Sequence, residues 1–256
     1  MLVFKITLAP ILIALVTLAG RKWGPGVAGW LLGFPLNSGP IIFFLLLERG
    51  PRFAASAARG SLLGILAWMA FCVTYAFCCN RMSWWWATLA GWLAYFLVAA
   101  AFFSVTVGVV WSYVLVIVAL LVVLALFPAV PESVEPSGLP REDLWLRMAT
   151  ASLMVLSLTA VAKALGATLS GILTAFPAYT TILAVFTHRH GAGFATRALK
   201  GVTAGLFTAA TFLMTLSVSL MHLNGTLSFA LAIAAALAVQ ATTLPFVRRT
   251  VRLVPG

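Results

Sequence analysis

Long apolar runs, separated by short clusters of charge, glycine and proline, extend over most of the chain. A helix that crosses a bilayer needs about 20 mainly apolar residues, and most of these runs have about that length. The run 84–128 is too long for one crossing, so we divide it near Ser104–Gly108. The pattern predicts nine transmembrane helices, at about 3–19, 26–47, 60–79, 84–104, 108–128, 144–164, 167–187, 198–221 and 225–246.

Composition favours the same class of protein. The 256 residues are 63% hydrophobic and only 8% charged, whereas soluble domains average about 25% charged residues. Backbone polar groups in lipid must bond to one another, and helices achieve this within one segment. The runs are continuous and do not alternate as the strands of a membrane barrel do. We therefore predict an all-α, polytopic transmembrane helical bundle.

Two predicted helices carry a Phe-Pro pair near the centre of the span. Proline removes a backbone donor and disfavours helix in the residue before it, while Asn, Ser and Gly favour turns and N-caps. A simple kink would explain one such break, but two at the same depth with clustered polar residues favour a midplane site. The candidate substrate-binding residues are Phe34, Pro35, Asn37, Ser38, Gly39 and Pro40 in the first copy, and Phe176, Pro177, Tyr179, Thr180 and Thr181 in the second.

The two copies belong to a longer internal repeat. A shift of 142 residues, which becomes 141 after a one-residue gap, aligns charge, glycine and proline in order. The aligned pairs are Lys5 with Arg147, Arg21 with Lys163, Gly29 with Gly171, Phe34-Pro35 with Phe176-Pro177, Arg59-Gly60 with Lys200-Gly201, and Gly64 with Gly205. We therefore divide the chain into a first membrane repeat (1–105), a connecting helix with a proline-rich acidic linker (106–143), and a second membrane repeat (144–256).

The connecting helix sets the relative orientation of the repeats. One extra crossing between two four-helix units inverts the second unit, and inverted repeats are common in transporters. Nine spans place eleven of the Lys and Arg residues on one side and five on the other. The positive-inside rule then puts the C-terminus in the cytoplasm and the N-terminus outside. A different span count within 84–128 would make the repeats parallel.

Short motifs in each half resemble the GlpM family. They are Ala28-Gly29 leading to Phe34-Pro35, then Glu48-Arg49-Gly50 and the region of Arg59. The second half departs from the pattern, with His190-Gly191 where Glu-Arg-Gly would stand. The resemblance implies two tandem copies of a small four-helix protein of the bacterial inner (plasma) membrane. It names no substrate.

Reactive side chains are sparse. Glu48 is the one carboxylate outside the linker, and no Asp or Glu lies at the centre of a predicted span. The sequence has no His–carboxylate cluster, metal-ligand spacing or phosphate loop, so we expect no enzyme activity, no metal site and no cofactor. The net charge of +11 lies mainly between apolar runs and suits lipid headgroups more than nucleic acid. Cys72, Cys78 and Cys79 are interpreted as small apolar fillers, and the histidines as interfacial loop residues.

Small and polar residues inside other spans have packing explanations. Gly60-x-x-x-Gly64 and Gly201-x-x-x-Gly205 match the pattern for close helix contact, and we assign them to packing. Gln240, Thr242 and Thr243 would either line a cavity or bridge helices.

The sequence therefore predicts a membrane transporter or facilitator for a small neutral or anionic solute. Restarting helices would direct free N–H groups and a positive dipole end to the midplane. The expected partners are the lipid bilayer and the solute, and a homo-oligomer is compatible with the sequence. The alternative from another class is a non-transporting scaffold or accessory protein in envelope or polysaccharide assembly, with a lipid flippase between the two.

Overall fold

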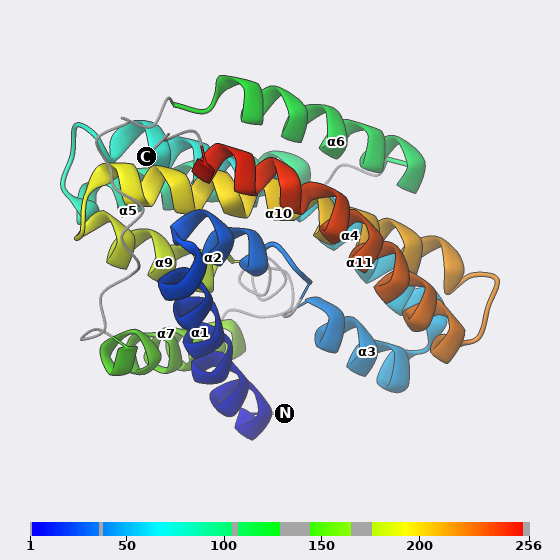
Figure 1. Cartoon of the computed structure of the whole chain (residues 1–256). Coiled ribbons are helices and arrows are strands. Elements are labelled where there is room, and N and C mark those ends of the chain that lie inside the picture. The colour runs from blue at the N-terminus through cyan, green and yellow to red at the C-terminus, as the bar shows by residue number, and fades with distance from the viewer. Residues whose placement is uncertain (1, 36–37, 104–106, 129–143, 165–175, 253–256) are drawn as a thin grey trace.

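The computed structural model describes residues 2–35, 38–103, 107–128, 144–164 and 176–252. These residues form helices and short connections, with no strand among them (Figure 1). Asn37, the linker 129–143 and the first part of the predicted seventh span lie outside the described residues. The helices are α1 Leu2–Trp23, α2 Pro25–Leu32, α3 Ser38–Arg49, α4 Pro51–Cys78, α5 Trp84–Phe103, α6 Val109–Leu126, α7 Leu144–Ala164, α9 Ala178–His188, α10 Ala192–Ser219 and α11 Gly225–Arg252.

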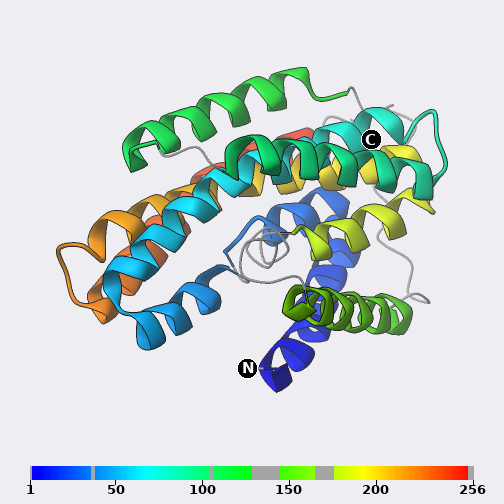
Figure 2. The same cartoon turned by 180° about the vertical axis from the view of Figure 1, so that it is seen from behind.

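Five of the described helices are long and apolar enough to cross a membrane: α4, α5, α6, α10 and α11. The axes of these helices are roughly aligned (Figures 1 and 2). α4 and α10 pack against each other and are antiparallel. α10 buries most of its residues, whereas α6 exposes most of its apolar surface. The all-helical membrane class predicted from the sequence is therefore supported.

One predicted boundary is confirmed. α5 is described as far as Phe103, and Gly108 lies directly before the start of α6 at Val109, so the division near Ser104–Gly108 is correct. Glycine favours a break in a helix, which is why the pattern located this division. The described residues 144–164 of α7 are helical, as predicted for the sixth span.

The predicted basic loop around 48–59 is wrong. The chain turns at Gly50 alone, with φ of 83°, and α4 begins at Pro51, so Arg52 and Arg59 lie on a helix. Pro51 suits the first helical position, and the alanines that follow it are strong helix formers. Arg52 and Arg59 interrupt the apolar run in the sequence, but they do not interrupt α4. For the same reason α10 begins at Ala192, six residues before the predicted start at 198, directly after Gly191, with φ of 134°.

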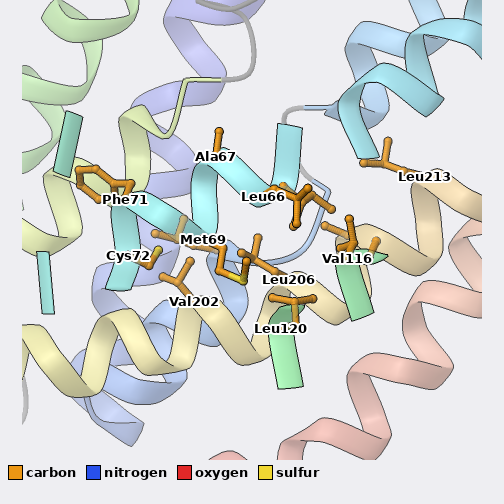
Figure 3. Packing of buried hydrophobic residues seen from close by; sticks show 14 of the residues in the cluster. Leu66, Ala67, Met69, Phe71, Cys72, Val116, Leu120, Val202, Leu206 and Leu213 are labelled. Atoms are coloured by element: carbon orange, nitrogen blue, oxygen red, sulfur yellow. The ribbon is translucent and has the colours of Figure 1, made fainter. Parts of the chain in front are cut away.

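The core lies where α4, α6 and α10 meet. Leu66 of α4, Val116 and Leu120 of α6, and Leu206 of α10 are buried against one another (Figure 3). On the other side of α10 lies the short helix α2, which also contacts α1, α9 and α11. Almost all of α2 is buried, so this eight-residue helix is at the centre of the molecule.

Glycines make the contact between α2 and α10 possible. A Cβ atom added to Gly29 of α2, or to Gly33 directly after it, would overlap the α10 backbone at Ala198 or Gly205, respectively. A Cβ on Gly201 would overlap the backbone of Gly26 in the same way. Glycine allows two helix backbones to touch, and this contact confirms the predicted packing role of Gly201 and Gly205. No Cβ contact within 4 Å would arise at Gly60.

Candidate functional site

The first Phe-Pro pair interrupts a helix as the sequence predicts. α2 ends at Leu32, and the Gly33 amide donates to the carbonyl oxygens of Gly29, at 3.3 Å, and Trp30, at 3.2 Å. Pro35 is buried, and its carbonyl accepts a 2.9 Å hydrogen bond from the Gly39 amide in the first turn of α3. The chain therefore leaves one short helix and enters another.

The second pair lies at the start of α9. Pro177 occupies the N-cap position, and the Ala178 amide donates to the Phe176 carbonyl at 2.8 Å. The Thr181 amide donates to the Pro177 carbonyl at 2.8 Å, which closes the first helical turn. The structure thus confirms a helix start after Pro177. The residues on the other side of this break, 165–175, lie outside the described part of the chain.

Two tryptophans hold the threonines of the second break. Trp68 of α4 donates its indole N–H to the Thr180 hydroxyl at 3.0 Å, and Trp92 of α5 donates to the Thr181 hydroxyl at 3.2 Å. The Thr181 hydroxyl in turn donates to the Pro177 carbonyl at 3.0 Å. Both threonines are buried, so in this conformation their hydroxyls are engaged by protein groups.

Aromatic rings surround Phe176. Its ring centroid lies 5.5 Å from that of Trp92, 5.4 Å from that of Tyr95 and 5.8 Å from that of Phe96. The contacts with Trp92 and Tyr95 are edge-to-face and the contact with Phe96 is stacked, and aromatic pairs of both kinds add about 0.5–1.5 kcal/mol beyond the burial of area. The second break therefore begins in a packed aromatic cluster supplied by α5.

A different network holds the first break. Gln240 of α11 donates its side-chain amide to the Trp30 carbonyl at 3.3 Å, and its oxygen accepts a hydrogen bond from Thr208 of α10. The Trp30 indole donates to the Thr243 hydroxyl at 2.9 Å, and that hydroxyl bonds to the Val239 carbonyl at 3.1 Å. Gln240 therefore serves a carbonyl at the end of α2. Of the two predicted roles for Gln240 and Thr243, the bridging role is confirmed.

The remaining predicted site residues lie beside these networks. Gly39 is buried with its Cα facing the Phe212 ring of α10, and Phe34, Ser38, Pro40 and Tyr179 are half-buried. α2 packs against α9, which brings the two interrupted segments into one central region (Figure 2). The side chains that bond to the two breaks, within the described residues, are all uncharged.

Histidine and cysteine gather at one end of α4, α9 and α10. The Tyr75 hydroxyl and His188 Nδ1 are 3.1 Å apart, and Cys79 Sγ lies 3.3 Å from the Thr196 hydroxyl. Burial lowers the pKa of His188 below its ordinary value, and a hydrogen bond to the Cys79 backbone offsets part of that change. His188 is thus the last residue of α9 and contacts α4. The prediction that it is an interfacial loop residue is wrong.

An arginine that the sequence assigned to the membrane interface is buried. Arg147 of α7 places its guanidinium carbon 4.9 Å from the centre of the Phe186 ring, and Arg189 lies 5.9 Å from the same ring. Desolvated cation–π pairs contribute about 2 kcal/mol. This contact joins α7 to the end of α9.

Sequence reasoning missed Trp30, Trp68 and Trp92 as parts of the site. A usable signal existed, because tryptophan usually lies at membrane interfaces, and one near the centre of a span must find an acceptor for its N–H. Each of these three indole N–H groups donates to a threonine hydroxyl. Among the described residues, no group of three or more His, Cys, Asp or Glu side chains is arranged to hold a metal ion.

Comparisons with protein-family models, with curated proteins and with solved structures give no match to this chain. The features that bear on function are therefore the two breaks and the residues that hold them. The side chains that bond to these breaks are uncharged and polar, and they lie inside an apolar bundle.

Proposed function

We propose that this protein is an integral membrane transporter or facilitator for a small neutral or anionic solute, with its site at the two interrupted helices. The observation that carries the proposal is the position of the breaks: both lie in the protein interior and both are tied by hydrogen bonds to neighbouring long helices. Interrupted helices inside a membrane bundle are a recurrent way to build a solute site.

The proposed architecture is a nine-span bundle of two inverted, GlpM-like repeats. Two equal offsets support it: α10 begins 141 residues after α4, at Ala192 and Pro51, and α11 begins 141 residues after α5, at Gly225 and Trp84. α4 and α10 have 28 residues each, and a glycine with positive φ precedes both. Their opposite directions in Figure 1 support inversion.

Topology can be tested at two equivalent turns. Ser83 and Asn224 are exposed, are 141 positions apart and precede α5 and α11. In inverted repeats, single cysteines at these positions would be labelled from opposite sides of a bacterial inner membrane, Ser83→Cys from the cytoplasm and Asn224→Cys from outside. Labelling of both from the same side would mean parallel repeats.

The class of solute follows from the donors. Indole N–H and threonine hydroxyl groups bind carbonyl, hydroxyl or anionic oxygens. A multivalent anion in an apolar interior would require cationic partners, and the groups that bond to the breaks are neutral. Neutral polar solutes and monovalent anions are therefore the proposed substrates.

Transport is tested in vesicles that contain the purified protein. Uptake of glycerol, urea, acetate, nitrate and sulfate is measured against empty vesicles, with Asn37→Ala and Thr181→Ala as site variants. Thr242→Ala is the matched control, because Thr242 is exposed and bonds only to the backbone of its own helix. We expect at least one neutral or monovalent solute to enter faster, and both site variants to slow it about tenfold. Equal rates with and without protein for every solute would contradict the proposal.

One observation favours the second candidate, a membrane scaffold. The Thr180 and Thr181 hydroxyls already have protein partners, and Phe176 is packed among three aromatic rings. A scaffold needs such satisfied contacts and no opening. Protein that is stably folded in vesicles, yet inactive with the whole solute panel, would favour this alternative.

A further inference from the structure

The hydrogen bonds at the two breaks connect opposite halves of the chain. We define the first half as α1–α5 and the second half as α7–α11. Trp68 and Trp92 belong to the first half, and they bond to Thr180 and Thr181 of the second half. Gln240 and Thr243 belong to the second half, and they bond to Trp30 of the first half.

Helix packing also connects the two halves at these breaks. α2 of the first half lies against α10 and α11 of the second half, and α9 of the second half contacts α5 of the first half. Beyond each break the chain returns to its own half, because α3 packs on α4 and α9 also packs on α10. Each interrupted segment is thus bound partly by its own half and partly by the other.

The two networks share one chemical arrangement. At the second break an indole N–H donates to the Thr181 hydroxyl, which donates to the Pro177 carbonyl. At the first break the Trp30 indole donates to the Thr243 hydroxyl, which bonds to the Val239 carbonyl. The tryptophan is contributed by the first half in both networks. The two contacts are therefore not equivalent, because α2 precedes the first break and α9 follows the second.

We infer that Trp68 and Trp92 of the first half, and Gln240 and Thr243 of the second half, are positioning residues that each control the interrupted helix of the opposite half. Water cannot replace a lost partner in an apolar interior, so a broken bond leaves an unsatisfied N–H or hydroxyl. Loss of one of these bonds would loosen the break it serves. The break in the residue's own half would keep its contacts.

The inference has a consequence for movement that rests on the proposed function. In a transporter with inverted repeats, one half moves against the other while the site stays near the midplane. Bonds between the halves must then break and form during the cycle, whereas bonds within a half persist. The four residues would thus hold the conformation seen here.

Amide hydrogen exchange of the full-length protein in lipid nanodiscs tests the inference without a substrate. Exchange reports local opening of backbone hydrogen bonds, and the two segments to follow are 29–34 and 178–183. Trp68→Phe should raise exchange in 178–183 about fivefold and leave 29–34 unchanged, as expected for the loss of one hydrogen bond. Thr243→Val should do the reverse.

Matched variants separate control of the break from general loosening. Trp84→Phe changes an exposed tryptophan and should alter neither segment. Thr243→Ser keeps the hydroxyl and should restore the slow exchange of 29–34. If Trp68→Phe does not fold, Thr180→Val breaks the same bond from its other partner. If Thr243→Val does not fold, Gln240→Leu removes the other bond to Trp30, at its carbonyl.

Three outcomes would overturn the inference: equal acceleration in both segments, no change in either segment, or acceleration only in the half that carries the Trp68→Phe, Thr243→Val or Gln240→Leu substitution. Failure of every solute to cross the vesicles would count against the proposed transport function alone, because the exchange pattern does not depend on a solute.

Discussion

The two interrupted helices carry the same Phe-Pro pair but are held by different kinds of contact. α2, which leads into the first break, is seated backbone to backbone on α10 through Gly26, Gly29 and Gly33. The start of α9, at the second break, is held by tryptophan–threonine bonds and by aromatic rings around Phe176. Hydrogen bonds hold both, but glycine packing against a helix backbone adds to them at the first and aromatic packing adds to them at the second. The same Phe-Pro pair is thus supported in two different ways.

The largest effect is expected at the glycine contact. Gly201→Ala would place a methyl group against the Gly26 backbone, with its carbonyl carbon 2.8 Å away, and neither helix backbone can move aside easily. We expect a loss of about 3 kcal/mol or more in the free energy of unfolding, measured by SDS titration in mixed micelles.

Gly60→Ala is the matched control, because the sequence alignment pairs Gly60 with Gly201, and Gly60 is exposed and has no atom within 4 Å of an added Cβ. It should gain about 0.5–1 kcal/mol, since alanine favours a helix interior. Equal losses at both positions would show that the two halves are packed alike and would remove the contrast.

The next effect is expected at Gln240, which joins the end of α2 to α10. Gln240→Leu leaves the Trp30 carbonyl and the Thr208 hydroxyl without this partner, which should cost about 1–3 kcal/mol in the same titration. Thr242→Val, two residues further along α11 at an exposed position, should stay within about 0.5 kcal/mol of the parent protein. A Gln240→Leu variant as stable as Thr242→Val would mean that glycine packing alone holds the first break.

At the second break, Thr181→Val should cost about 1 kcal/mol. It removes the acceptor for the Trp92 indole while it preserves side-chain volume. Thr181→Ser keeps the hydroxyl and should lose less. If valine and serine prove equally stable, the aromatic cluster, and not the hydrogen bond, holds this break.

The smallest effect is the pH dependence of stability that His188, at the end of α9, contributes. Burial lowers the pKa of His188 in the folded protein below the ordinary histidine value of about 6.5. As pH falls, His188 is therefore protonated in the unfolded state before it is protonated in the folded state. The stability that the neutral imidazole contributes is present above that value and is lost as pH falls through the folded pKa. Thermal unfolding between pH 7.5 and 5.5 should show a smaller acid loss in His188→Gln than in the parent protein. His222→Gln, at an exposed loop histidine, should keep the parent slope.

The sequence predicted the helical class, the break after Pro35 and the helix start after Pro177 because each depends on local chemistry. Proline removes a backbone donor wherever it stands, and a long apolar run favours a helix in lipid. The start of α4 was misplaced by nine residues because arginine was interpreted as the end of a helix, although its long side chain can reach the interface from inside one. The partners of the breaks were missed because Trp68 and Thr180 are 112 positions apart, beyond any local pattern.

What the sequence determined by itself was therefore the position of each interruption, since backbone donors and apolar length are properties of a segment. Only the tertiary structure decided which groups satisfy the interruption. A glycine contact needs a second backbone at the right place, and an indole N–H needs an acceptor brought from another helix. Trp30, Trp68 and Trp92 became part of the site when packing placed a threonine hydroxyl beside each indole, and Gln240 beside the Trp30 carbonyl as well.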